Sequence, residues 1–242
     1  MVVLFHPTLM KLLSRLVFAG ALCASSASAA DFEGTVTMKM RQAKEAPQVV
    51  NFSLTKGRSR IDIATPDGNA AVLFTATAGE MIILLPEQKM YLVQSVPKPG
   101  DLPGAGDHPD QSVKQTNEKE KILGYDCVKY ISTSPEGTTD IWVTDQLGAF
   151  MGLGGGNPMG GPGSGGPVPQ AWEQALRGKE VFPLRVITKG PKGRETFRME
   201  ATAVKKQPLP ASTFNPPEDF QKLDVGNMMR GMSMPGMRPP GR

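Results

Sequence analysis

Downstream of its N-terminal segment, the chain alternates apolar and polar residues with a period of two. Val36, Met38 and Met40 are separated by polar residues, and the same alternation recurs over residues 50–54 and 61–63. A period of two places every second side chain on the same face of an extended strand. These segments are therefore predicted to be half-buried β-strands, joined by turns at TKGR and TPDGN.

The remainder of the chain continues this strand pattern. The apolar stretch EMIILLPEQKMYLVQ is expected to form a pair of strands with a turn at its proline. Three more strands are predicted at Gln115 to Lys121, Tyr125 to Thr133 and Thr138 to Thr144. The segments FPLRVITKG and RETFRMEATAV are expected to form a hairpin through GPKG. We therefore expect a single β-rich domain over residues 30–225.

Two segments and one helix interrupt the strands. Trp172, Ala175 and Leu176 in PQAWEQAL recur at helical spacing and predict a short helix. The Gly/Pro tract over residues 148–169 is predicted to be a flexible insert, because it has too little apolar surface to offset its ordering entropy. The Met-rich tail over residues 226–242 is predicted to be disordered for the same reason.

Residues 1–29 have the features of a secretory signal peptide. Basic Lys11 and Arg15 precede an apolar run, and Ala27 and Ala29 supply the small side chains of a cleavage site. The apolar run is shorter than the roughly 20 residues that span a bilayer, so no transmembrane anchor is expected after cleavage. Lipidation at Cys23 is an alternative that the preceding leucine disfavours. We expect a soluble, periplasmic mature protein.

The charge balance of that mature protein gives no reason to expect nucleic-acid binding. Removing Lys11 and Arg15 from the 27 basic residues leaves 25 against 23 acidic ones, a net charge of +2. Basic and acidic residues are mixed along the chain, whereas a nucleic-acid interface needs a concentrated basic surface.

The sequence offers few groups for catalysis. Of the two histidines, His6 leaves with the signal peptide and His108 lies in a Pro/Gly-rich loop. There is no G-x-S-x-G motif, no compact set of zinc ligands, and GLGGGN lacks the last glycine and the helix start of a phosphate-binding loop. We therefore expect neither an enzyme nor a cofactor.

Cys127 is the one cysteine outside the signal peptide, so an internal disulfide is excluded. Lys129 would share its strand face and favour a reactive thiolate. However, Cys127 stands in an apolar strand, and cysteine is among the most frequently buried residue types. Structural burial is the favoured interpretation.

The tail carries five methionines where no core requires them. Thioether sulfur is a soft ligand that suits Cu(I), so a Met-rich periplasmic Cu(I)-binding protein is one alternative function. The other interpretation is a disordered tail without a selected role. The candidate metal ligands are Met228, Met229, Met232, Met234 and Met237.

The order of several short motifs resembles a known family. GYDCVKY, TTDIWVTD, FPLRVITKG and LPASTFNPPEDF occur in that order between residues 32 and 223. They resemble an uncharacterised exported bacterial family, a domain of unknown function, which in turn resembles the periplasmic lipoprotein-carrier (Lol-type) superfamily. The positions that carry the resemblance are Gly124, Tyr125, Cys127, Tyr130, Ile141, Trp142, Asp145, Pro183, Arg185, Leu209, Pro210, Phe214, Pro216 and Phe220.

The resemblance implies a mainly β fold, in which a curved antiparallel sheet forms a half-open barrel with one or two short helices packed at its mouth. It also implies an apolar concave face able to take acyl chains. The expected function is non-enzymatic binding of a lipid, an acylated peptide or another apolar ligand. The second alternative is a protein-interaction module of the cell envelope, which would bind a protein partner. The candidate lining residues are Met38, Phe52, Ile61, Ile83, Tyr91, Trp142, Leu184, Phe197 and Met199.

Overall fold

The computed structural model describes residues 32–43, 46–65, 68–95, 112–135, 137–153, 171–176 and 178–223. Within these ranges twelve strands form one sheet. The strands are β1 (Gly34–Gln42), β2 (Gln48–Thr55), β3 (Arg58–Thr65), β4 (Gly68–Thr75), β5 (Glu80–Leu85), β6 (Met90–Ser95), β7 (Ser112–Ile122), β8 (Tyr125–Ser134), β9 (Gly137–Thr144), β10 (Phe182–Lys189), β11 (Glu195–Lys206) and β12 (Gln221–Lys222). The helical elements are α1 (Ala171–Leu176) and the 3₁₀ turns η2 (Pro86–Gln88) and η3 (Ala211–Phe214). None of them has the length and apolar character needed to cross a bilayer.

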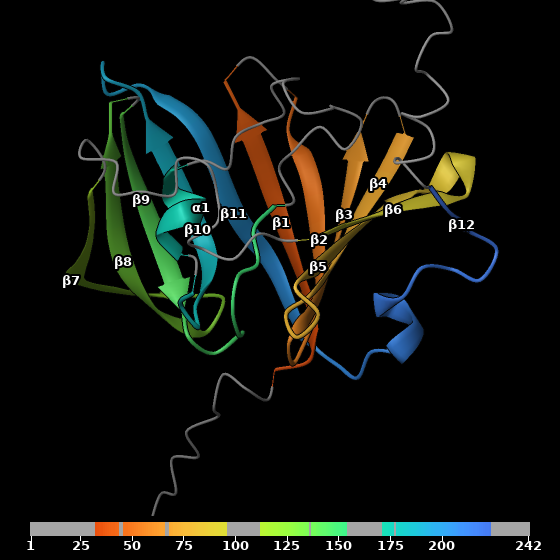
Figure 1. Cartoon of the computed structure of the whole chain (residues 1–242). Coiled ribbons are helices and arrows are strands. Elements are labelled where there is room, and N and C mark those ends of the chain that lie inside the picture. The colour runs from red at the N-terminus through yellow and green to blue at the C-terminus, as the bar shows by residue number, and fades with distance from the viewer. Residues whose placement is uncertain are drawn as a thin grey trace, which may run out of the picture.

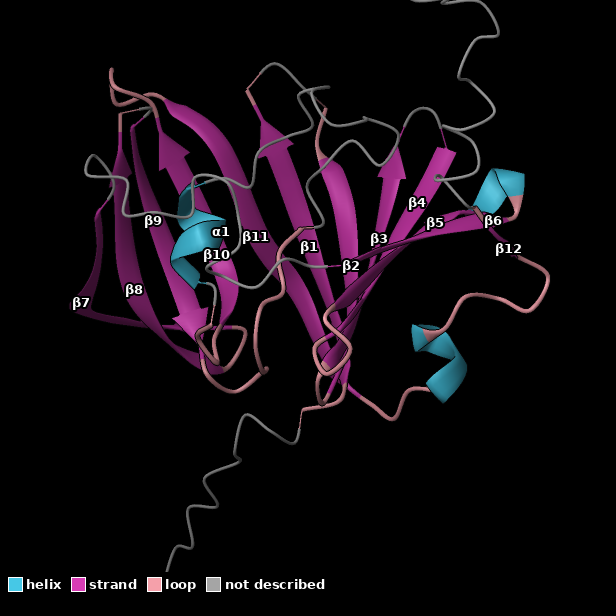
Figure 2. Cartoon of the chain, viewed as in Figure 1, coloured by secondary structure: helices cyan, strands magenta, loops and turns pink. Residues whose placement is uncertain are grey.

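The sheet consists of two meanders, β1 to β6 and β7 to β11, which join side by side through β1 and β11, and β12 is added beside β6. Its strand order is β12-β6-β5-β4-β3-β2-β1-β11-β10-β9-β8-β7, so β1 lies beside β11 and the edges are β7 and β12. All pairs are antiparallel except β12 with β6. Figure 1 shows the two halves of the sheet inclined toward each other, with α1 on the side that both halves face, and we call the region between them the trough. The predicted mainly β fold with a curved, unclosed antiparallel sheet is confirmed, and Figure 2 shows how little helix accompanies it.

The alternation in the sequence determines which side chains enter the trough. Val36 and Met38 on β1 are fully buried, while Thr37 between them points to the opposite side. Val36 pairs with Phe52 on β2, and Met40 pairs with Met199 on β11. Directly paired residues point to the same side, so these apolar positions form one continuous surface. We call this side the inner face and the opposite side the outer face.

A tight turn joins β7 to β8. Ile122 pairs with Tyr125, which leaves Leu123 and Gly124 as the two turn residues. Both have positive φ angles, 50° and 89°. Two consecutive positive angles define the type I′ turn, whose twist matches that of a hairpin. Glycine adopts this conformation freely, whereas Leu123 is strained there and leaves 47% of its surface exposed.

The C-terminal segment covers part of the outer face. Ala71, Leu73 and Leu84 form a small buried cluster there, against which Tyr91 and Phe220 pack. Upstream of Phe220, η3 is held against β3, because Arg58 donates a 2.7 Å hydrogen bond to the carbonyl of Phe214 and lies 5.3 Å from its ring centroid. The outer face of β3 to β6 therefore has its own core, separate from the trough.

Candidate functional site

Five aromatic rings fill the centre of the trough. Phe52 on β2 meets Phe182 on β10 edge to face, with ring centroids 5.4 Å apart. Phe150 lies 6.2 Å from Phe52 and 5.7 Å from Phe182. Trp172 stacks on Phe150 at 5.6 Å and on Phe197 at 6.3 Å. Phe150 thus contacts rings from both halves of the sheet, and Trp172 connects Phe150 to the ring of Phe197 on β11.

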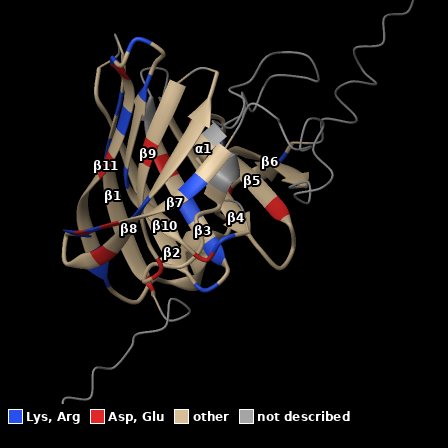
Figure 3. Ribbon diagram, turned by 90° about the vertical axis from the view of Figure 1, so that its left-hand side faces the viewer, with Lys and Arg blue, Asp and Glu red and all other residues tan. Residues whose placement is uncertain are grey.

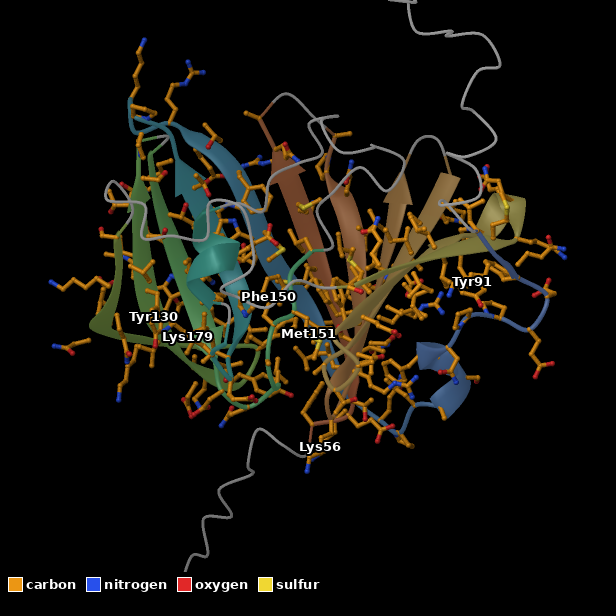
Figure 4. All side chains as sticks on the ribbon, viewed as in Figure 1. Lys56, Tyr91, Tyr130, Phe150, Met151 and Lys179 are labelled. Atoms are coloured by element: carbon orange, nitrogen blue, oxygen red, sulfur yellow. The ribbon has the colours of Figure 1, made fainter. Side chains whose placement is uncertain are left out.

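Phe150 and Trp172 both come from the connection between β9 and β10, which covers the inner face. The backbone N–H of Phe150 donates a 2.9 Å hydrogen bond to the carbonyl of Val181. The backbone N–H of Leu153 donates a 3.1 Å hydrogen bond to the buried carboxylate of Glu173 on α1. These contacts tie the first part of the connection to its last part. Figure 4 shows Phe150 and Met151 between the two halves of the sheet.

The structure brings most of the predicted lining residues together. Met38, Phe52, Ile61, Leu184, Phe197 and Met199 belong to one buried cluster, and none exposes more than 5% of its surface. Ile83 is also buried and pairs with Val72, a member of that cluster. The cluster extends over strands from both halves of the sheet and includes Trp172 and Leu176 of α1.

Two predicted lining residues lie elsewhere. Tyr91 packs against the outer-face cluster of Leu84, and Figure 4 shows it on β6, far from Phe150. Trp142 is half-buried at the margin of the large cluster, where its register partners are Lys129 and Arg185. The ammonium of Lys129 lies 5.9 Å from the Trp142 ring centroid. The alternation of apolar and polar residues does not distinguish Tyr91 and Trp142 from residues of the inner face, because both faces of this sheet bury apolar side chains.

Phe150 belongs to this site, although the sequence pattern does not predict it. Phe150 falls within residues 148–169, which were predicted to be a flexible insert, and yet it is only 5% exposed. The signal that could have identified it is the apolar triplet Phe150, Met151 and Leu153 at the start of the glycine-rich run. Residues 154–169 of the predicted insert lie outside the described part of the chain.

The outer face of β10 and β11 carries charged pairs instead of apolar ones. Arg185 donates two hydrogen bonds of 2.9 and 2.8 Å to the carboxylate of Glu120 and one of 2.8 Å to Glu200. Partial burial acts to lower the pKa of Arg185, but the hydrogen bonds to the two carboxylates outweigh it and raise that pKa. Figure 3 shows basic and acidic positions interspersed over this end of the sheet.

A second group of ion pairs continues along β11 to β1. Glu195 accepts hydrogen bonds from Arg198 and from Arg41, at 2.8 Å in each case. The hydrogen bond from Arg198 is the main cause that lowers the pKa of Glu195 to about 2, with a smaller contribution from Arg41 and an opposing one from partial burial. We call Glu120, Arg185, Glu200, Arg198, Glu195 and Arg41 the outer-face ion pairs.

Cys127 is buried, as the sequence analysis favoured. It exposes 1% of its surface, and its thiol donates a weak 3.6 Å hydrogen bond to the carbonyl of Tyr125. Burial raises the pKa of Cys127 to about 11; a hydrogen bond from the backbone of Ile122 opposes this shift. A thiol that stays protonated at neutral pH is a poor nucleophile and a poor metal ligand.

The potential metal ligands of the described ranges are dispersed. These ranges contain no group of three or more histidine, cysteine or acidic side chains placed to hold a metal ion. The candidate Cu(I) ligands of the tail, Met228 to Met237, and the predicted signal peptide lie outside the described residues.

Comparison with known proteins identifies a family. Residues 32–220 match the family described as "Domain of unknown function (DUF4412)". No curated protein matches the chain.

Solved structures with a similar course of the chain share little sequence with it. An uncharacterised conserved protein from Thermus thermophilus has 10% identity and a TM-score of 0.48, over 81% of this chain and 91% of that one. PNGF-II has 15% identity and a TM-score of 0.46 over 82% of this chain, which spans only 32% of PNGF-II. A putative outer membrane lipoprotein-sorting protein domain from Vibrio parahaemolyticus has 12% identity and a TM-score of 0.33, over 77% and 90% of the two chains.

Proposed function

We propose that this chain, which belongs to the DUF4412 family of domains of unknown function, binds a lipid, an acylated peptide or another apolar ligand on the inner face of its sheet. In this proposal the protein is non-enzymatic and periplasmic. The observation that carries the proposal is that, over the described part of the chain, the inner face is covered by a connecting segment and not by a second sheet. The sheet is open, and its apolar trough is closed in the described residues by α1 and Phe150, two short pieces of the β9–β10 connection.

The chemistry of the trough suits an acyl chain. Its walls are aliphatic and aromatic side chains, and each methylene group moved from water into such surroundings contributes about 0.8 kcal/mol. The rings of Phe150 and Trp172 occupy the space that the ligand would share. Because these rings come from a connection and not from the sheet, a ligand can replace their contacts without breaking a strand pair.

Two further observations support the absence of catalysis. The Cys127 thiol, whose pKa burial raises to about 11, is buried and stays protonated at neutral pH. The other strongly shifted group is Glu195, which is engaged by two arginines. The periplasmic location rests on the predicted signal peptide at residues 1–29.

Lipid extraction and mass spectrometry of protein purified from the periplasm test the proposal. We expect a co-purifying lipid or acylated molecule, and we expect delipidated protein to bind a fluorescent fatty acid that quenches Trp172. The variant Phe150→Ala opens space beside Trp172 and should bind the fatty acid more tightly. Val49→Ala changes an outer position that is 49% exposed and serves as the control. The absence of both a co-purifying lipid and fatty-acid binding would refute the proposal.

The filled centre of the trough favours a second candidate, an envelope protein-interaction module. The five rings form five contacting pairs whose centroids are 5.4–6.3 Å apart, as in a permanent core. In that case the inner face stabilises the fold, and a protein partner binds elsewhere. Crosslinking in the periplasm followed by identification of the partner distinguishes the two functions: a specific crosslink from lipid-free protein supports this second one.

A further inference from the structure

The outer face carries a hollow where β1 and β11 meet. It has a volume of about 290 Å³ and lies on the side opposite the aromatic trough, because the charged side chains that line it alternate with inner-face residues along both strands. Lys39, for example, follows the fully buried Met38 and pairs with Glu200. The lining residues are Lys39, Arg41, Pro47, Arg198, Glu200, Ala201 and Thr202.

An irregularity in the sheet accompanies the hollow. Thr37 pairs with Ala203 and Met38 pairs with Ala201, so Thr202 is an extra residue without a partner on β1. Its hydroxyl donates a 3.2 Å hydrogen bond to the carbonyl of Thr37. Such a β-bulge bends its strand and redirects the neighbouring side chains, and bulges are frequent beside functional sites. The position of the hollow is therefore set by the bulged backbone of β11 as well as by side-chain conformations.

The charges around the hollow do not balance. Lys39, Arg41 and Arg198 supply three positive charges, and Glu195 and Glu200 supply two negative ones. Glu200 is also shared with Arg185 outside the hollow. One cationic charge is left over. Among the described residues Lys39 has no ion-pair partner, and Arg41 contacts Glu195 through Nη2 alone, with its side chain 57% exposed. Unused N–H donors therefore remain at the rim.

We infer that this hollow is a second binding site, for a small organic molecule that carries one negative charge on a carboxylate or a phosphodiester group. The excess charge of +1 matches a monoanion. The planar guanidinium of Arg41 and the ammonium of Lys39 can both donate to such an oxyanion. Pro47 provides an apolar wall for the rest of the molecule.

Titration with two probes, monitored by NMR shifts of the Ala201 and Thr202 amides, tests the inference. The probes are butyrate for the carboxylate and glycerophosphoglycerol for the phosphodiester of a lipid headgroup, each at constant ionic strength. We expect saturable shifts below about 10 mM with at least one probe. Preference for butyrate identifies a free carboxylate as the ligand group, and preference for glycerophosphoglycerol identifies a headgroup. Either result supports the site.

The variants separate a site from general surface charge. Lys39→Gln combined with Arg41→Gln should weaken binding about tenfold or more, and Lys39→Gln alone should weaken it less. The single variant keeps the test valid if the double variant fails to fold. Lys205 is an exposed residue of β11 outside the hollow, so Lys205→Gln should leave the affinity unchanged. Unsaturable shifts with both probes, or equal losses in the Lys39 and Lys205 variants, would overturn the inference. Neither result would affect lipid binding in the trough.

Discussion

Arg185 on β10 forms a two-pronged hydrogen bond with Glu120 on β7, although β9 and β8 lie between these strands in the sheet. Neighbouring strands are about 4.8 Å apart, so a flat sheet would hold the two residues roughly 14 Å apart. Because side chains on a strand stand roughly perpendicular to the sheet, the contact fits a sheet whose β7 end bends toward the outer face. Glu200 on β11 binds the same guanidinium from the other side.

Replacement of Arg185 is expected to loosen this end of the sheet. Arg185→Gln removes charge-assisted hydrogen bonds from a side chain that is 20% exposed, and we expect a loss of about 1–3 kcal/mol in the free energy of unfolding. Urea unfolding measures the loss. A double-mutant cycle with Glu120→Gln should give a coupling of about 1 kcal/mol. Arg41→Gln, at an exposed pair, is the control and should cost under about 1 kcal/mol. Equal losses for both arginines would contradict this role.

The Cys127 thiol is expected to react slowly in the folded protein. Labelling by a thiol reagent at pH 8 should be far slower than in urea, because the thiol is buried and its pKa is about 11. The folded state holds this proton more tightly than the unfolded state, whose thiol has a pKa near 9.0. Stability should therefore fall as pH rises from about 9 through 11. Cys127→Ala should remove that part of the pH dependence, and rapid labelling at pH 8 would show the burial to be wrong.

Glu195 should give an opposite dependence in acid. Hydrogen bonds from Arg198 and Arg41 hold its pKa at about 2, below the ordinary 4.5. Its contribution to stability is thus complete above about pH 4.5 and is lost as pH falls through 2. Thermal unfolding between pH 2 and 6 measures this loss, which should be smaller in Glu195→Gln. The same change at exposed Glu87 should leave the acid dependence as it is.

Leu123 is a site where substitution should stabilise the protein. It is the first residue of a type I′ turn with φ of 50°, a conformation that costs a branched aliphatic residue about 1 kcal/mol. Leu123→Asn gives the Asn-Gly pair that this turn prefers, and we expect unfolding to require about 1 kcal/mol more. Leu123→Ala keeps the unfavourable backbone angle and is the control. A melting temperature of Leu123→Asn no higher than that of the control would contradict the strain.

The strands could be predicted because their signal is local. The alternation of Val36, Met38 and Met40 gave the faces of β1 correctly, and the short helix around Trp172 is present as α1. Phe150 could not be placed in this way. Its short apolar segment is flanked by Gly148 and Gly152, which favour no regular element, and it is buried by rings from β2 and β10, which are distant in sequence.

The C-terminal segment shows the same limit. Nothing in the local pattern around Phe214 and Phe220 indicates that one docks against Arg58 and the other completes a second core. The sequence pattern likewise predicts Tyr91 on the inner face, because the alternation does not reveal the second core on the outer face.

The local pattern of the chain is enough to predict its β-rich character, the positions of most strands and the side chains that alternate between two faces, because these properties depend on neighbours within a few residues. Long-range contacts account for the rest: both faces bury apolar residues, Phe150 and Trp172 close the trough, and Glu120 contacts Arg185. These features depend on strand order and sheet curvature. Both arise from contacts between residues far apart in the chain, which a period of two does not encode.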